Sequence, residues 1–125
     1  MPLPTEREES LKIASWARMM VETNQEPRLR LLRCGFEGLR LSMGLRMQVK
    51  RQSISKGWPD WALFVPQRYP VPYHGLLIEL KREKGGVLSF DQTIMHKLLE
   101  EQGYIVAVAY GGDHAIDIII KYLGI

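Results

Sequence analysis

Several features are scarce or missing in this sequence of 125 residues, and each absence excludes a class of protein. Cys34 is the single cysteine, which excludes an internal disulfide and a multi-thiolate zinc site. No run of about 18 apolar residues is present, so we expect no membrane span and no membrane partner. The first ten residues lack the apolar core of a signal peptide, and we therefore expect an intracellular, cytoplasmic protein.

The remaining composition is that of an ordinary globular chain. Hydrophobic residues make up 46% and charged residues 25%, and neither repeats nor low-complexity tracts interrupt the sequence. A chain of this length supports one hydrophobic core. We therefore expect a single domain over residues 1–125.

Positive charge is concentrated in one third of the chain. Residues 28–56 hold eight basic residues and one acid, whereas the segments on either side each hold two more acids than bases. Such a block favours a polyanionic partner, although a solvated helix face would look similar. The candidate nucleic-acid contacts are Arg46, Lys50, Arg51 and Lys56.

The N-terminal segment has the pattern of a helix over residues 5–24. Thr5 is a candidate N-cap, Glu8 completes a capping box, and Pro27 follows the end. Residues 28–56 are ambiguous because three glycines interrupt them. Residues 29–32 fit a strand or a helix, and a short helix is expected over residues 39–49.

From Gly57 onward the pattern alternates between strands and helices. Strands are expected over residues 60–65, 75–81 and 104–110, and the last should be internal because it is apolar on both faces. Helices are expected over residues 90–102, capped by Ser89, and 114–123. This order predicts an α/β fold with a small mixed sheet flanked by helices.

The strand at residues 75–81 ends in charged residues. Side chains alternate between the faces of a strand, so Leu76, Ile78 and Leu80 face the core while Glu79 and Lys81 face the other side. The charged pair is either an exposed rim pair of little energetic value or part of a site.

Asp60 adds a second carboxylate to this region. If the strands at 60–65 and 75–81 form a hairpin, the start of the first lies beside the end of the second, where Glu79 and Lys81 are found. Two carboxylates suit Mg²⁺ or Mn²⁺, and a lysine beside them can orient water or stabilise developing charge. Taken alone, Asp60 also fits a turn-capping role after Pro59.

An ordered set of motifs resembles a known family. The sequence contains GWPDWALF, then IELK, then GGVLSFDQ, and finally GYIVAVAYGGDHAIDIIIKYL. Together these segments, which cover residues 57–125, resemble the VRR-NUC family of the PD-(D/E)XK nuclease superfamily. Asp60 matches the first acid of the motif, Glu79-Leu80-Lys81 matches ExK, and Gln92 matches a glutamine of the following helix.

The resemblance implies a fold and a set of site residues. The implied fold is a restriction-endonuclease-like αβββαβ core. Asp60, Glu79 and the Leu80 carbonyl would hold Mg²⁺ or Mn²⁺, and Lys81 would assist the attacking water. An acid from the first helix commonly joins such a site, for which Glu6 is favoured and Glu9 is the substitute; helix-dipole complementation is the alternative role for both. Ser10 stands where the family pattern usually has glutamine.

The resemblance also implies a function. Compact stand-alone members, often from phage or bacterial genomes, act on branched DNA and resemble homodimeric Holliday-junction resolvases. We therefore expect a metal-dependent, structure-specific DNA endonuclease of this kind, in which a C₂ dimer makes two symmetric cuts. A nicking or restriction-type nuclease on linear duplex, a non-catalytic DNA-binding module and a structural protein with incidental charges are the alternatives.

Other chemically interesting residues have simpler expected roles. His74, His96 and His114 show no metal-ligand spacing and are expected at the surface or in helix caps. Cys34 is expected to be a small buried hydrophobic residue. Core packing is favoured for both Trp58 and Trp61.

Overall fold

The computed structural model describes residues 2–35 and 42–125. In chain order the elements are α1 (Glu6–Glu22), the 3₁₀ helix η1 (Pro27–Leu31), β1 (Leu32–Cys34), α2 (Met43–Gln52), β2 (Trp61–Leu63), β3 (Leu76–Lys81), α3 (Phe90–Glu101), β4 (Ile105–Tyr110) and α4 (Gly112–Leu123). No helix in this part of the chain has the length and apolar character needed to span a membrane.

The strands form one mixed sheet in the order β1-β2-β3-β4. The β1–β2 and β2–β3 pairs are antiparallel, and β4 runs parallel to β3. Helix α3 connects β3 to β4, as a parallel crossover requires. The predicted α/β fold with a small mixed sheet is confirmed, and so is the hairpin between β2 and β3.

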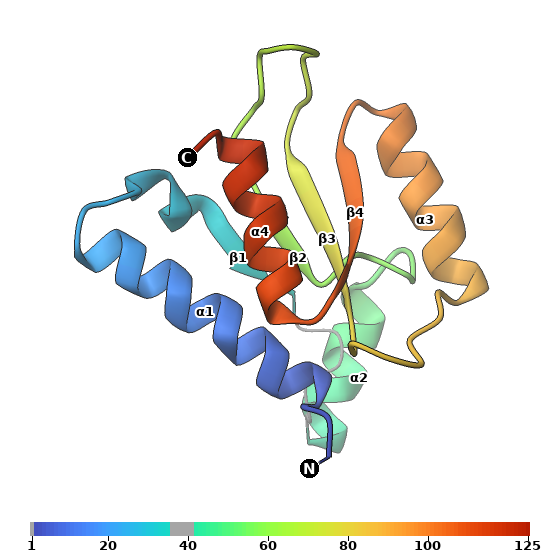
Figure 1. Ribbon diagram of the computed structural model, residues 1–125. Helices are drawn as coiled ribbons and strands as arrows, with labels where there is room; N and C mark the ends of the chain where they lie inside the picture. Colours follow the sequence, from blue (N-terminus) through green and yellow to red (C-terminus); the bar gives the residue numbers. More distant parts are fainter. Residues whose placement is uncertain (1, 36–41) are drawn as a thin grey trace.

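Helices cover both faces of this sheet (Figure 1). On one face α1 and α4 cover a core that includes Ile13, Leu63, Ile78 and Ile119, each at most 1% exposed. On the other face α3 packs Met95 and Leu99 against Leu77. Both faces of β3 are therefore buried, and a charged side chain on either face is removed from water.

The prediction that residues 104–110 form an internal strand is wrong. Among the described strands β4 pairs with β3 alone, so it lies at an edge of the sheet. Its apolar side chains have a different cause, since α3 and α4 both contact β4 (Figure 1). A strand that is apolar on both faces is packed between two layers of helices, but it can still lie at the edge of the sheet.

Two helices begin with the capping boxes that the sequence indicates. The Thr5 side chain accepts a hydrogen bond from the Glu8 amide, and the Glu8 side chain accepts one from the Thr5 amide. Ser89 and Gln92 make the same pair of bonds at the start of α3. These reciprocal bonds satisfy amide groups that the first helical turn leaves without partners.

The basic segment, residues 28–56, contains most of η1 together with β1 and α2. The three residues of β1 form the edge strand next to β2, and α2 spans Met43–Gln52 rather than residues 39–49. The predicted start of that helix lies outside the described residues. None of the ten side chains of α2 is buried, so α2 extends away from the core (Figure 1).

Candidate active site

The antiparallel pairing of β2 with β3 brings Asp60 to the charged end of β3. Asp60 immediately precedes β2, and its Oδ2 accepts a hydrogen bond of 2.7 Å from the Leu80 amide. The Asp60 carboxyl also lies close enough to the Glu79 carboxyl to raise the pKa of Glu79. The hairpin therefore places Asp60, which precedes β2, beside Glu79 and Leu80 of β3.

Pro59 gives the Leu80 carbonyl no backbone hydrogen-bond donor. The register pairs Trp61 with Ile78, so its continuation places Pro59 opposite Leu80. The Asp60 carbonyl accepts a hydrogen bond from the Gly35 amide, so the backbone groups of residue 60 point towards β1. The backbone groups of residue 59, just before β2, therefore point towards Leu80. Because proline has no N–H, that position offers no backbone donor to the Leu80 carbonyl. The carbonyl oxygen points to the side of β3 on which Asp60 lies.

Glu79 is a buried carboxyl without a cationic partner. It is 2% exposed, and among the described residues it forms no salt bridge with Lys or Arg. Burial, followed by the hydrogen bond and the charge of Asp60, raises the pKa of the Glu79 carboxyl to about 9. Lys81 opposes this shift and Glu6 adds to it. Two carboxyls in contact at low dielectric require either a shared proton or a cation.

This donor set fits a divalent cation. Asp60 and Glu79 supply carboxylate oxygens and Leu80 supplies a carbonyl oxygen, which are the ligands that Mg²⁺ and Mn²⁺ prefer. Within residues 2–35 and 42–125, no three His, Cys, Asp or Glu side chains form a metal-binding group. The remaining coordination positions would therefore fall to water and substrate, as is usual for Mg²⁺.

Lys81 is held on both sides beside these carboxyls. Its Nζ donates a hydrogen bond of 3.0 Å to Oε1 of Gln92, the same oxygen that accepts from the Ser89 amide. Its side-chain stem lies against Gly86, where an added Cβ would come within 2.7 Å of the Lys81 Cβ. The capping role of Gln92 and its contact with Lys81 therefore coexist.

The segment before Asp60 is fixed against α3. Gly57 has φ of +88°, and a Cβ there would clash with the Asp91 carbonyl oxygen. Only glycine fits this position without strain. Trp61 is buried as predicted and donates from Nε1 to Ser10 Oγ over 3.0 Å, but Trp58 is 48% exposed, so the core-packing prediction for Trp58 is wrong.

His96 belongs to the site, contrary to the prediction of a surface or capping role. It is 6% exposed, and its Nε2 lies 3.2 Å from Oε1 of Glu79. The signal in the sequence is its spacing of four residues from Gln92, which places both residues on one face of α3. Burial, and then the nearby charge of Lys81, lower the pKa of His96, although Glu100 and Asp60 oppose that shift.

The other two histidines and the cysteine lie apart from the carboxyls. His114 accepts a hydrogen bond from the Tyr110 amide through Nδ1 at the start of α4, and His74 lies against Tyr104. Both are exposed. Cys34 is also exposed, so the prediction that it is buried is wrong, because β1 is an edge strand with one uncovered side.

The two candidate acids of the first helix point to different places. Glu6 is exposed, and its charge raises the pKa of Glu79, so it lies within electrostatic reach of the carboxyl pair. Glu9 is fully buried against Gly111 and Gly112 at the start of α4, and its Oε1 lies 3.1 Å from Lys12 Nζ. Its position at a helix N-terminus fits the helix-dipole role.

The candidate DNA-contacting residues are all exposed. Arg46, Lys50 and Arg51 are on α2, and Lys56 follows it. Only four residues separate the end of α2 from Gly57, so the chain keeps this basic helix within reach of the carboxyl pair. Figure 1 shows α2 beyond the end of β3 that carries Lys81.

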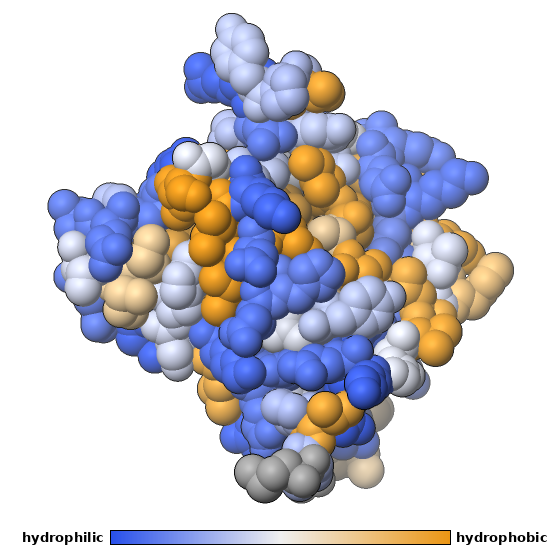
Figure 2. Space-filling model, in the orientation of Figure 1, coloured by the Kyte–Doolittle hydropathy of each residue, from blue (hydrophilic) through white to orange (hydrophobic). Residues whose placement is uncertain are grey.

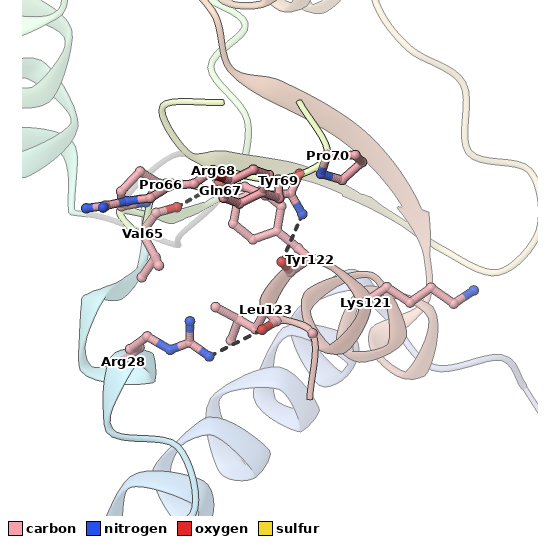
Figure 3. A pocket seen from close by; sticks show the side chains of 11 residues that line it. Arg28, Val65, Pro66, Gln67, Arg68, Tyr69, Pro70, Lys121, Tyr122 and Leu123 are labelled. Atoms are coloured by element: carbon pink, nitrogen blue, oxygen red, sulfur yellow. Dashed lines mark hydrogen bonds between the residues drawn. The ribbon is translucent and has the colours of Figure 1, made fainter. Parts of the chain in front are cut away.

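One hollow in the described part of the molecule contains none of these residues. It has a volume of about 480 Å³ and lies beside the C-terminal end of α4 (Figure 3). There Gln67 Nε2 donates to the Tyr122 carbonyl over 3.1 Å, and Arg28 donates to the Leu123 carbonyl over 3.3 Å. Its polar groups hold the end of α4 and do not converge on a ligand.

Comparison with known proteins supports the fold. No family model matches the chain, and no curated protein matches it significantly. A solved structure described as a "VRR_NUC domain protein" superimposes with a TM-score of 0.74 at 22% sequence identity, over 98% of this chain and 91% of that one. The chain therefore has a VRR-NUC-type, restriction-endonuclease-like fold.

Proposed function

We propose that this protein is a Mg²⁺- or Mn²⁺-dependent DNA endonuclease that cuts branched DNA, as a homodimeric Holliday-junction resolvase does. The observation that carries the proposal is the convergence of the Asp60 and Glu79 carboxyls at the end of β3, where Asp60 accepts from the Leu80 amide and Gln92 holds Lys81. The nuclease-type fold of the similar VRR_NUC domain protein supports it.

Each residue of the site has a distinct role in phosphodiester hydrolysis. Asp60, Glu79 and the Leu80 carbonyl would hold the cation, which supplies Lewis-acid polarisation of the phosphate and a more acidic water. Lys81, held by Gln92, orients the attacking water and stabilises the negative charge that develops on the phosphate. Glu6 lies near enough to contribute negative charge.

The exposed basic residues fit the DNA backbone. Arg46, Lys50, Arg51 and Lys56 would contact phosphates, which positions the duplex without reading its sequence. This arrangement agrees with a nuclease that recognises the shape of a branch.

The dimer follows from the chemistry of a junction. One site cuts one strand, and resolution of a four-way junction needs two symmetric cuts, which a C₂ dimer provides. Phe90, Ile94 and Leu98 leave an apolar stripe exposed along α3, and Figure 2 shows apolar side chains gathered at the lower end of this helix. A second copy of the chain could bury such a stripe. Sedimentation equilibrium at micromolar concentration should show a dimer, and a monomer alone would contradict this part of the proposal.

The decisive experiment compares a labelled four-way junction with a linear duplex of matched sequence. Each substrate is incubated with Mg²⁺, with Mn²⁺ and with EDTA, using the wild type, Glu79→Ala and Lys81→Ala. Glu22→Gln and Lys97→Ala, at exposed positions that are not among the proposed site residues, are the matched controls. We expect paired cuts in the junction only, lost in EDTA and in both site variants but not in the controls.

Other outcomes would select among the alternatives. Cutting of the linear duplex as well would indicate a nicking or restriction-type nuclease. Binding without any cutting, weakened by salt, would indicate a DNA-binding module on the same fold.

A further inference from the structure

One face of α3 contacts both charged residues of the β3 motif. Gln92 accepts from Lys81, and His96, one turn later, contacts Glu79. Met95 and Leu99 anchor the same helix in the core beneath β3. The buried face of α3 therefore holds the two side chains against β3.

The contact between His96 and Glu79 restricts the carboxylate. Glutamate has a long side chain that loses rotamer freedom when it is held in one orientation, and a buried carboxylate needs hydrogen-bond donors. When Glu79 is ionised, only the tautomer with hydrogen on Nε2 can donate to Oε1. This bond ties Oε1 of Glu79 to α3 and leaves Oε2 for a ligand.

We propose that His96 is a positioning residue, which fixes the Glu79 carboxylate so that Glu79, Asp60 and the Leu80 carbonyl bind a divalent cation together. The inference rests on the proposed metal site, but it concerns binding of the cation and not the cutting of DNA. In this proposal His96 makes no direct contact with the cation, because its Nε2 is already engaged by Oε1 of Glu79.

The test measures Mn²⁺ binding to the intact protein by isothermal titration calorimetry, without DNA. His96→Leu removes the donor, whereas His96→Gln keeps an N–H donor at a similar reach. Loss of a hydrogen-bond partner to a metal ligand typically weakens binding about 10–100-fold. We expect His96→Leu to show such a loss in Mn²⁺ affinity and His96→Gln to recover most of it.

Two further variants separate positioning from packing. Met95→Leu disturbs the neighbouring buried position on α3 without touching Glu79, and it should bind Mn²⁺ like the wild type. His96→Asn keeps a polar residue but is too short to reach Oε1, so it should lose affinity like His96→Leu even if the leucine variant fails to fold. Thermal unfolding in EDTA checks that each variant is folded.

The outcomes for the inference and for the proposed function differ. Unchanged Mn²⁺ affinity in folded His96→Leu or His96→Asn would overturn the inference, and so would a failure of Glu79→Gln to reduce Mn²⁺ binding. If the His96 variants lose affinity as expected but the wild type cuts no DNA, the positioning role stands and the proposed nuclease activity fails.

Discussion

Two buried glutamates, Glu26 and Glu79, have opposite electrostatic surroundings. Glu26, 5% exposed, accepts three hydrogen bonds from Arg28, two from its guanidinium and one from its backbone amide. These bonds lower the pKa of Glu26 despite its burial. Glu79, 2% exposed, lies against a second carboxyl, and its pKa is raised to about 9.

The difference between them separates a structural carboxylate from a binding one. Arg28 also donates to the Leu123 carbonyl, so the Glu26–Arg28 pair joins η1 to the end of α4 and is complete within the chain. The negative charge of the Glu79 and Asp60 carboxyls is compensated only when a proton or an external cation binds between them. Burial alone therefore does not indicate a site; burial of acid beside acid does.

The largest expected difference is in activity. Glu79→Gln removes a cation ligand and should reduce cleavage of the preferred DNA substrate by more than about 100-fold. Glu26→Gln, at a similarly buried glutamate outside the site, should stay within about twofold of the wild type once folding is confirmed. Initial rates at saturating Mg²⁺ measure both. Equal losses in the two variants would remove the distinction between the carboxylates.

Stability should respond in the opposite order. Glu26→Gln weakens charge-assisted hydrogen bonds and should cost about 1.5–3 kcal/mol, towards the lower end because Arg28 is half-exposed. Glu79→Gln in EDTA replaces a carboxyl that has a second carboxyl as its neighbour, so it should change the free energy of unfolding by less than about 1 kcal/mol. Urea unfolding at pH 7 provides both values. A larger loss of stability in Glu79→Gln would mean that other groups of the chain already compensate the charge of Glu79.

The pH dependence of stability sharpens the comparison further. The pKa of Glu26 is lower in the folded protein than its ordinary value of 4.5. Its stabilising contribution is therefore fully present above that value and is lost as the pH falls through the folded-state pKa. The stability gap between the wild type and Glu26→Gln should narrow between pH 5 and the acid limit of folding. Urea midpoints across this range test it, and a constant gap would show that packing rather than charge stabilises the pair.

Local patterns predict most of the fold. Capping residues determine where α1 and α3 begin, and alternation along β3 correctly separates Ile78 from Glu79. The edge strand β1 is harder, because three residues of mixed character carry no period of their own. Its strand conformation depends on pairing with β2, which is a tertiary contact.

The site was predictable only in part for the same reason. Asp60, Glu79 and Lys81 stand out because charge is unusual at those positions of buried strands. His96 shows no such anomaly, since a histidine on an exposed helix would give the same pattern; only the packing of α3 over β3 brings it to Glu79. The same packing leaves Trp58 outside the core while Trp61, three residues later, is inside.

The smallest expected effect concerns α2, whose side chains support no core. Lys50→Ala leaves the core intact because this side chain is exposed, so the free energy of unfolding should change by less than about 0.5 kcal/mol. If Lys50 contacts one phosphate, the slope of log binding constant against log salt concentration should become shallower by about 0.9. Fluorescence anisotropy with a labelled junction in EDTA, from 50 to roughly 200 mM salt, gives this slope independently of cleavage.

Lys97→Ala, exposed on α3, is the matched control and should leave the slope unchanged. Equal slopes for the wild type and Lys50→Ala would place the DNA away from α2, and the exposed basic helix would then have a role other than phosphate binding.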